Sequence, residues 1–247
     1  MKALLLAAGR GTRISRYLNG NPKCTVSVGD LTLIENTVRR LRRAGIHEIG
    51  IATGYRQEVI RDILKGYPIQ FFYNPFYDVT NSIASAWFAR DFIKGDEDIL
   101  IMNADVFIED SILDIIIAEQ RSPVMLSDES RKEDGDYKFY YENEILMKYG
   151  KELTGKDITG EYVGIAKIGR AHVLRFVEKL EEMIRVQKHS VWWENVLYED
   201  VDKYPVYIHN IQGKFWAEVD YIEDYERILN YLGYQLGDFL NVRSNET

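Results

Sequence analysis

Short apolar runs alternate with helical patterns along the first half of the chain. Four of these runs are apolar or β-branched and bounded by turn residues, as expected of buried parallel strands: residues 2–6, 48–53, 69–73 and 98–102. Between them, apolar residues recur at helical spacing, first at Ile34, Val38 and Leu41, then from Val59 to Leu64, and again across residues 110–120. This alternation predicts a doubly wound, mostly parallel α/β sheet, whose ligands bind beyond the carboxyl ends of its strands.

The pattern changes after about residue 126. Two strand-like runs, 137–142 and 162–168, flank a polar segment at 148–160 that we interpret as a mobile lid. Helical patterns follow at 170–188 and 221–232. We therefore expect one domain over residues 1–234, with a first half at 1–126, a smaller α+β portion at 127–220, a closing helix at 221–234, and a tail at 235–247 that frays over its last residues.

Composition and charge narrow the class of protein. With 46% hydrophobic and 28% charged residues, the chain of 247 residues is an ordinary globular one. Its net charge of −8 argues against nucleic acid and anionic membranes as partners. It has no apolar run of about 20 residues and no signal-peptide pattern, so we expect a cytoplasmic protein without membrane insertion. Its single cysteine, Cys24, and four scattered histidines leave oxygen as the expected ligand of any metal.

A glycine-rich turn, within the opening stretch MKALLLAAGRGTR, directly follows the first predicted strand. It lacks the Gly-Lys-Ser/Thr ending of a P-loop, and Ile14 stands where a dinucleotide-binding loop has its third glycine. A tight turn capping a core strand is the plain structural alternative. However, Arg10, Arg13 and Lys23 add three positive charges, and glycines let backbone N–H groups approach phosphate oxygens. The stretch therefore favours a cradle for a triphosphate.

Two aspartates lie in matching contexts far along the chain. Asp105 follows a predicted core strand in IMNADVF, and Asp220 precedes the last predicted helix in WAEVDYIEDYERIL. With LLLAAGRGTR and the downstream Pro-Lys pair ending at Lys23, these motifs resemble the nucleotidyltransferase superfamily that includes the sugar-1-phosphate nucleotidylyltransferases, which has a Rossmann-like fold. The resemblance implies that Asp105 and Asp220 bind Mg²⁺, an ion that prefers oxygen ligands shared with substrate phosphates. Taken singly, the two residues also fit a turn and a helix N-cap.

Other segments depart from the sugar enzymes. The chain has PKC where those enzymes usually have PKP, and it lacks their segment of glutamine followed by Gly-Thr-Ala. Instead, YNPFYDVTNSIASAWFARD, with Asn81 and Ser85, is similar to the bacterial phosphocholine cytidylyltransferase branch, and GEYVGIAKI resembles segments of that branch and of related phosphonate cytidylyltransferases. This resemblance implies CTP as the nucleotide. An asparagine amide can pair with a cytosine edge, although Thr80 or Asn81 could instead cap the helix that follows.

The resemblance implies a nucleotide site formed by the loop and by residues that follow neighbouring strands. Its expected members are Ala7, Ala8, Gly9, Arg10, Gly11, Thr12, Arg13, Lys23, Gly54, Tyr55, Asn81, Ser85 and Asp105. In the implied reaction, an oxygen of a small phosphate or phosphonate acceptor attacks the α-phosphorus of CTP and pyrophosphate leaves. Lys23 and Arg13 are the expected catalytic residues, because positioning and charge stabilisation would carry the reaction.

Aromatic and acidic residues of the second half are candidates for binding the acceptor. They are Glu161, Tyr162, Trp192, Trp216 and Glu218. Aromatic faces hold a quaternary ammonium by cation–π attraction, whereas the two glutamates could pair a primary ammonium. Both remain open, as do a sugar-1-phosphate nucleotidylyltransferase making a nucleotide sugar and a regulatory subunit that binds nucleotide without turnover. A homodimer is compatible with the exposed apolar helix faces.

Overall fold

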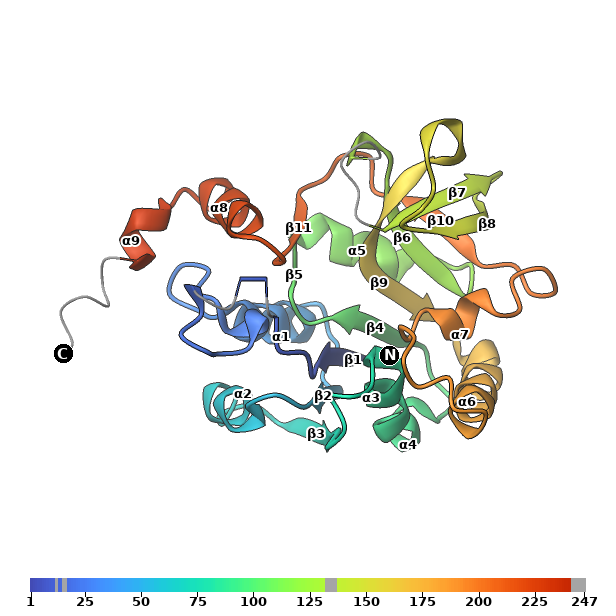
Figure 1. Ribbon diagram of the computed structural model, residues 1–247, viewed down its shortest axis with the longest axis horizontal. Coiled ribbons are helices and arrows are strands. Elements are labelled where there is room, and N and C mark those ends of the chain that lie inside the picture. The colour runs from blue at the N-terminus through green and yellow to red at the C-terminus, as the bar shows by residue number, and fades with distance from the viewer. Residues whose placement is uncertain (12, 15–16, 132–136, 241–247) are drawn as a thin grey trace.

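The computed structural model describes residues 1–11, 13–14, 17–131 and 137–240. The predicted nucleotide ligand Thr12 and the frayed end predicted at 241–247 lie outside this range. Figure 1 shows a twisted central sheet with helices packed on both of its faces. Within the described part of the chain, every helix is too short or too polar to span a membrane.

The parallel part of the sheet has the strand order β3-β2-β1-β4. Its strands are β1 (Lys2–Ala7), β2 (Ile49–Thr53), β3 (Ile69–Tyr73) and β4 (Ile99–Asn103). The helices of this half are α1 (Leu33–Arg43), α2 (Gln57–Ile63), α3 (Ser82–Phe88), α4 (Arg90–Ile93) and α5 (Asp110–Ala118). All four predicted runs form parallel strands, with bounds that shift by one residue at most. Burial is as predicted for β1, β2 and β4, whereas every residue of the edge strand β3 is partly or fully exposed.

The sheet continues past β4 as β9-β6-β10-β8-β7, which makes nine strands among the described residues. The added strands are β6 (Val124–Asp128), β7 (Lys138–Glu142), β8 (Ile145–Gly150), β9 (Gly160–Ile168) and β10 (Tyr207–Asn210). Here β9 is antiparallel to both β4 and β6, whereas β10 runs parallel to β6. The sheet is continuous across residue 126, so the division expected at that residue falls inside a strand.

Helices and short turns complete this second half. They are α6 (Arg170–Arg185), α7 (Asn195–Tyr198) and the 3₁₀ turns Glu129–Arg131 and Gly155–Asp157. The helix predicted at 170–188 ends early because Gln187 adopts a left-handed backbone with φ of 63°. The segment predicted as a lid at 148–160 begins as the end of β8, so its first residues belong to the sheet.

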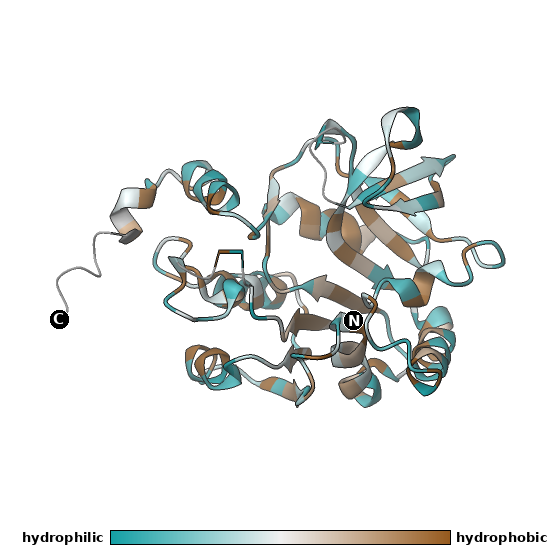
Figure 2. Cartoon of the chain, viewed as in Figure 1, coloured by the Kyte–Doolittle hydropathy of each residue, from teal (hydrophilic) through white to brown (hydrophobic). Residues whose placement is uncertain are grey.

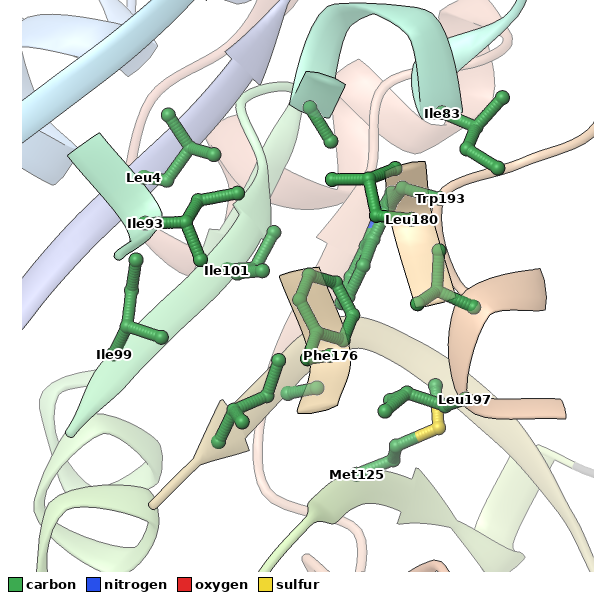
Figure 3. Close-up of a cluster of buried hydrophobic side chains, with 14 of the residues drawn as sticks. Leu4, Ile83, Ile93, Ile99, Ile101, Met125, Phe176, Leu180, Trp193 and Leu197 are labelled. Carbon is green, nitrogen blue, oxygen red and sulfur yellow. The ribbon is translucent and has the colours of Figure 1, made fainter. Parts of the chain in front are cut away.

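Strand β1 packs both of its faces against helices. Leu4 and Leu6 face a cluster with residues of α3, α4, α6 and α7, while Ala3 and Leu5 face a cluster with residues of α1, α2 and α5. Figure 3 shows part of the first cluster, including Leu180 and the ring of Trp193. Figure 2 shows hydrophobic residues concentrated on the central strands and hydrophilic residues on the outer sides of the helices. This two-sided burial explains why the strands read as continuous apolar runs.

A third hydrophobic cluster joins the end of the chain to the segment after the glycine loop. The two-stranded sheet of β5 (Val106–Ile108) and β11 (Trp216–Glu218) leads into α8 (Ile222–Tyr231) and α9 (Leu236–Leu240). Tyr225 and Leu229 of α8 pack with Ile14 and Val26, and the Tyr225 hydroxyl donates a hydrogen bond to the Ser27 carbonyl at 2.6 Å. Helix α8 lies within the range expected for the closing helix, 221–234. The expected tail, by contrast, contains α9.

Candidate active site

A cleft of about 510 Å³ opens beyond the carboxyl ends of β1 and β4. Residues from both halves of the chain line it, in agreement with the rule for open α/β sheets. Thirteen predicted site residues are among those lining it: Ala8, Gly9, Gly11, Arg13, Lys23, Asn81, Ser85, Asp105, Glu161, Tyr162, Trp192, Glu218 and Asp220. The structure therefore gathers into one cavity side chains that lie as far apart in sequence as the first strand and the last helix.

The glycine loop is shaped around the side chain of Lys23. Gly11 has φ of 64°, and a β-carbon at this position would stand 2.0 Å from the Lys23 Cγ. Only a glycine lets the aliphatic part of the lysine cross the loop at this distance. The Lys23 ammonium is thereby delivered into the cleft from a 3₁₀ turn (Lys23–Thr25) that begins directly after Pro22.

The strand pair β5–β11 brings the two predicted metal ligands together. Asp105 immediately precedes β5, and Glu218, the last residue of β11, lies opposite Val106. The Val219 N–H donates to the Asp105 carbonyl at 3.0 Å, which places Asp220 next to Asp105. One carboxylate oxygen from each of Asp105, Glu218 and Asp220 lies within 4.8 Å of the others. Three hard oxygen donors at this spacing suit a cation such as Mg²⁺.

Lys23 lies between the two aspartates. Its Nζ is 2.6 Å from an Asp105 carboxylate oxygen and 2.5 Å from an Asp220 carboxylate oxygen. Burial alone would lower the pKa of the ammonium, but the negative charges of Asp105, Asp220 and Glu218 outweigh that effect and raise the pKa of Lys23 above its ordinary value. The lysine is therefore a permanent cation at any working pH.

The pKa values of Glu218 and Asp220 are shifted in opposite directions. Burial and the neighbouring Asp105 charge raise the pKa of Glu218 well above its usual range. Burial would also raise the pKa of Asp220, but the charges of Lys23 and Arg13 hold it below its ordinary value. Asp220 and Lys23 are thus both ionised. The cations Lys23 and Arg13 therefore meet the aspartates beside the glycine loop.

Helix α3 closes one side of the cleft. Asn81 is its N-cap, with the side-chain oxygen accepting a hydrogen bond from the Ser82 N–H at 2.7 Å. Ser85 is buried, and its hydroxyl accepts from the Asn74 amide at 3.0 Å. The capping alternative for Asn81 is therefore realised. A role for either residue in base recognition stays a prediction.

The opposite side of the cleft is aromatic and acidic. Trp193 is fully buried and donates from its indole N–H to the Asn103 side chain at 3.2 Å, which fixes its neighbours Trp192 and Glu194 at the cleft. Trp192 is 41% exposed, with the Lys151 ammonium 5.5 Å from the centre of its ring. The far end of the cleft thus combines an indole face with a lysine ammonium and a buried carboxyl group.

Glu161 and Tyr162 reach this end of the cleft from β9. Both side chains are buried, and the Arg131 guanidinium forms an ion pair with Glu161 at 3.3 Å. Burial raises the pKa of the Tyr162 hydroxyl well above its usual range, so the hydroxyl stays protonated. The pairing with Arg131 means that Glu161 does not enter the cleft as an isolated charge.

The comparisons with known proteins agree with this geometry. Residues 3–197 match the family described as the MobA-like NTP transferase domain, which is well over half of the chain. The chain belongs to this family. It is therefore a nucleotidyltransferase.

Two curated relatives of the nucleotidyltransferase align over most of both chains. A CTP:phosphoglutamine cytidylyltransferase of Campylobacter jejuni is 28% identical over 250 residues, which cover 92% of this chain and 98% of the relative. A 2-aminoethylphosphonate cytidylyltransferase of Lancefieldella rimae is 25% identical over 228 residues, covering 90% and 89%. Among solved structures, the CTP:phosphocholine cytidylyltransferase of Streptococcus pneumoniae has a TM-score of 0.75 at 19% identity, covering 94% and 98%. At that identity the solved structure supports the fold alone.

Four predicted nucleotide ligands of the nucleotidyltransferase do not line the cleft. They are Ala7, Arg10, Gly54 and Tyr55. The last two support the loop from behind: the Tyr55 N–H donates to the Ala8 carbonyl at 3.0 Å, and a β-carbon on Gly54 would stand 2.7 Å from the same oxygen. Arg10 lies at the rim in an ion pair with Asp78 at 3.0 Å, and Ala7 is buried in the core.

Trp216, an expected acceptor ligand, does not line the cleft. Its ring is 4% exposed, packs in the core, and donates its indole N–H to the Asp128 carboxylate at 2.9 Å. Residues 216 and 218 alternate onto the same face of a strand, yet of the two only Glu218 lines the cleft. An aromatic residue two positions from a site residue gave a misleading signal.

Sequence reasoning missed several residues that line the cleft. They include Tyr77, Asn103, Tyr137, Lys151 and Glu194. Two had a usable signal, since Lys151 lies in the polar segment interpreted as a lid and Glu194 directly follows the Trp192–Trp193 pair. Tyr77, Asn103 and Tyr137 lie in strands or loops, and the sequence pattern does not show which way their side chains point.

Glu194 should make stability fall as the pH rises. Burial raises the pKa of its carboxyl to about 8, from the 4.5 of an exposed glutamate. Between these values the unfolded chain releases a proton that the folded chain keeps, so the free energy of unfolding falls by up to about 1.4 kcal/mol per pH unit. A Glu194→Gln variant lacks this loss and should gain stability over the wild type as pH rises through this window, as urea unfolding at several pH values would measure.

The exposed Glu223 provides a matched control. Glu223→Gln removes the same charge from the first turn of α8, at a side chain open to solvent. Its stability relative to the wild type should stay nearly constant over the same pH range. Equal pH dependence of the wild type and the Glu194→Gln variant would contradict a neutral Glu194.

Proposed function

We propose that this nucleotidyltransferase is a cytidylyltransferase, which transfers CMP from CTP to a small phosphate or phosphonate acceptor and releases pyrophosphate. The observation that carries the proposal is the Lys23 ammonium, held at 2.6 and 2.5 Å between Asp105 and Asp220 beside a glycine loop. This arrangement supports charge stabilisation at an α-phosphate flanked by the loop and the carboxylates. The names of the aligned relatives support CTP and an acceptor that already carries phosphorus.

The proposed reaction needs no general base. A phosphate monoester has a second pKa of about 6, so the acceptor is largely dianionic at neutral pH and attacks directly. Lys23 would contact the acceptor and the α-phosphate, while Arg13 and the loop N–H groups would hold the β- and γ-phosphates of the leaving pyrophosphate. The raised pKa of Lys23 keeps this charge in place, since the ammonium does not have to deprotonate at any step.

Mg²⁺ is the proposed cofactor. Asp105 and Asp220 would hold it, with Glu218 close enough to assist, because all three offer oxygen ligands within 4.8 Å of one another. When bound, the ion would polarise the α-phosphate and offset the charge of the triphosphate. Lys23 now compensates both aspartates, so it would move from the carboxylates to the phosphates as substrates enter.

The acceptor end of the cleft fits a small molecule with a polar, charged tail. Trp192 offers a half-exposed ring, and Glu161, Glu194 and Lys151 provide charged or protonated groups around it. An ammonium or zwitterionic tail on a phosphate or phosphonate matches these groups better than the uncharged hydroxyls of a hexose. This favours the cytidylyltransferase over the alternative that makes a nucleotide sugar.

A substrate panel tests the proposal. Pyrophosphate release would be measured with CTP, UTP, dTTP and GTP, each against phosphocholine, 2-aminoethylphosphonate, phosphorylated glutamine and glucose-1-phosphate. We expect release with CTP and one of the first three acceptors, and none without Mg²⁺. Faster turnover of glucose-1-phosphate with UTP or dTTP would replace the proposal with the sugar nucleotidyltransferase.

A further inference from the structure

Arg13 of the glycine loop is held by two different kinds of contact. Its guanidinium donates to an Asp220 carboxylate oxygen at 2.7 Å and lies 5.4 Å from the centre of the Tyr221 ring. The carboxylate and the ring come from consecutive residues at the start of α8. The backbone N–H groups of both residues point to the Asp224 carboxylate, at 3.3 and 2.9 Å, so the position of the pair is fixed by the helix cap.

Arg10, the other described arginine of the loop, is held in the same manner at the opposite rim. Its guanidinium lies 5.5 Å from the centre of the Tyr55 ring and pairs with Asp78 at 3.0 Å. The loop thus carries two arginines, each resting on a tyrosine face and paired with an aspartate. The repetition indicates that the aromatic contacts orient the guanidinium groups.

Core packing does not account for the position of Tyr221. The side chain is 52% exposed, whereas Tyr225, one turn further along α8, is 6% exposed and belongs to the third hydrophobic cluster. A tyrosine ring that stays half in solvent adds little burial energy. The contact of the Tyr221 ring with Arg13, at the mouth of the cleft, is therefore the interaction that explains the position of this side chain.

The contacts of Arg13 with Asp220 and with Tyr221 should respond differently when substrates bind. Asp220 forms ion pairs with both Lys23 and Arg13. In the proposed function Asp220 also becomes a metal ligand, which would weaken its ion pair with Arg13. The Tyr221 face carries no formal charge, and among the described residues Arg13 is the cation that lies over it. A cation–π contact therefore persists while the carboxylate changes partners.

We propose that Tyr221 is a positioning residue, which keeps the Arg13 guanidinium beside the triphosphate when Asp220 gives up its ion pair with it. The inference rests on the proposed function in two respects, namely that Arg13 binds the β- and γ-phosphates and that Asp220 becomes a metal ligand. It requires the aromatic ring and not the hydroxyl. The Tyr221→Phe variant should therefore keep the positioning of Arg13, and the Tyr221→Ala variant should lose it.

The test uses inorganic tripolyphosphate as a probe that has phosphates but no base. Its dissociation constant, and that of CTP, would be measured by calorimetry for the wild type and for Tyr221→Ala and Tyr221→Phe. We expect Tyr221→Ala to weaken both ligands by about three- to thirtyfold, the range of a cation–π contact from an exposed to a desolvated site. Tyr221→Phe should stay within about twofold of the wild type.

Tyr204→Ala is the matched control. Tyr204 is also a half-exposed tyrosine, 44% exposed, with the Arg175 guanidinium 3.0 Å from its ring centre, but it is not among the residues lining the cleft. This variant loses an equivalent arginine–tyrosine contact and should bind tripolyphosphate like the wild type. Thermal melting of all variants would verify that they are folded.

The outcomes separate the inference from the proposed function. Unchanged tripolyphosphate binding in Tyr221→Ala, an equal loss in Tyr221→Phe, an equal loss in the Tyr204→Ala control, or no binding of tripolyphosphate by the wild type would each overturn the role of Tyr221. A wild type that binds tripolyphosphate but prefers another nucleotide to CTP would overturn the cytidylyltransferase. In that case the ratio between Tyr221→Ala and Tyr221→Phe still decides the inference, since the probe has no base.

Discussion

Replacing Asp105 or Asp220 with asparagine is expected to abolish nucleotidyl transfer and leave the protein folded. Each substitution keeps the shape of the side chain but removes a charge from the group of carboxylates proposed to hold Mg²⁺. The rate should fall by about a thousandfold or more, because losing the ion removes its stabilisation of the transition state. Pyrophosphate release at increasing Mg²⁺ concentrations would measure it.

Asp114→Asn is the control for these two variants. Asp114 lies exposed on α5, so the change removes the same charge without touching the cleft. Thermal melting should remain cooperative in all three proteins, because Asp105 and Asp220 lie at the cleft surface and outside the three hydrophobic clusters. Near-normal turnover of either cleft variant at saturating Mg²⁺ would rule out that aspartate as a metal ligand.

Lys23→Met is expected to reduce the rate of transfer far more than the affinity for CTP. Methionine retains most of the aliphatic stem that crosses Gly11 but removes the ammonium that lies between the aspartates. If Lys23 stabilises charge mainly in the transition state, kcat should fall about a hundred- to a thousandfold, while the dissociation constant of CTP rises about tenfold or less. Steady-state kinetics and calorimetry would measure the two quantities separately.

The exposed Lys65 supplies the comparison for Lys23. Lys65→Met removes a surface ammonium after α2 and should leave both kcat and CTP affinity near the wild-type values. A Lys23→Met variant that loses binding and rate by the same factor would show that Lys23 anchors phosphate equally in the ground and transition states.

The sequence predicted the parallel part of the fold well because of where those strands lie. β1, β2 and β4 are buried between helices on both faces, so their residues form mostly apolar runs that can be recognised without knowing the topology. Strands β5 and β11 have three residues each, too few for a periodic pattern, and the pairing between them was not predicted. Yet this short pair aligns Asp105 with Asp220, so the site depends on an element that the pattern does not reveal.

In the candidate site, likewise, the sequence predicts one part better than the other. The motifs around Gly11, Lys23, Asp105 and Asp220 are carried by residue type and spacing, and the structure brings them into one cleft. The acceptor end depends on side-chain direction, which neighbouring residues do not share. Trp193 is fully buried while the adjacent Trp192 is 41% exposed. Periodicity over so few residues cannot distinguish the two.

The pairing of β5 with β11 also determines when the candidate site is completed during synthesis of the chain. A ribosome-bound chain that has emerged as far as β10 already contains the glycine loop, Lys23 and Asp105, but it lacks Glu218 and Asp220. Because chains emerge from the N-terminus at about 5–20 residues per second, the parallel sheet has time to form before β11 is available. Nascent chains can therefore acquire most of their core before the proposed metal-binding group of carboxylates is complete.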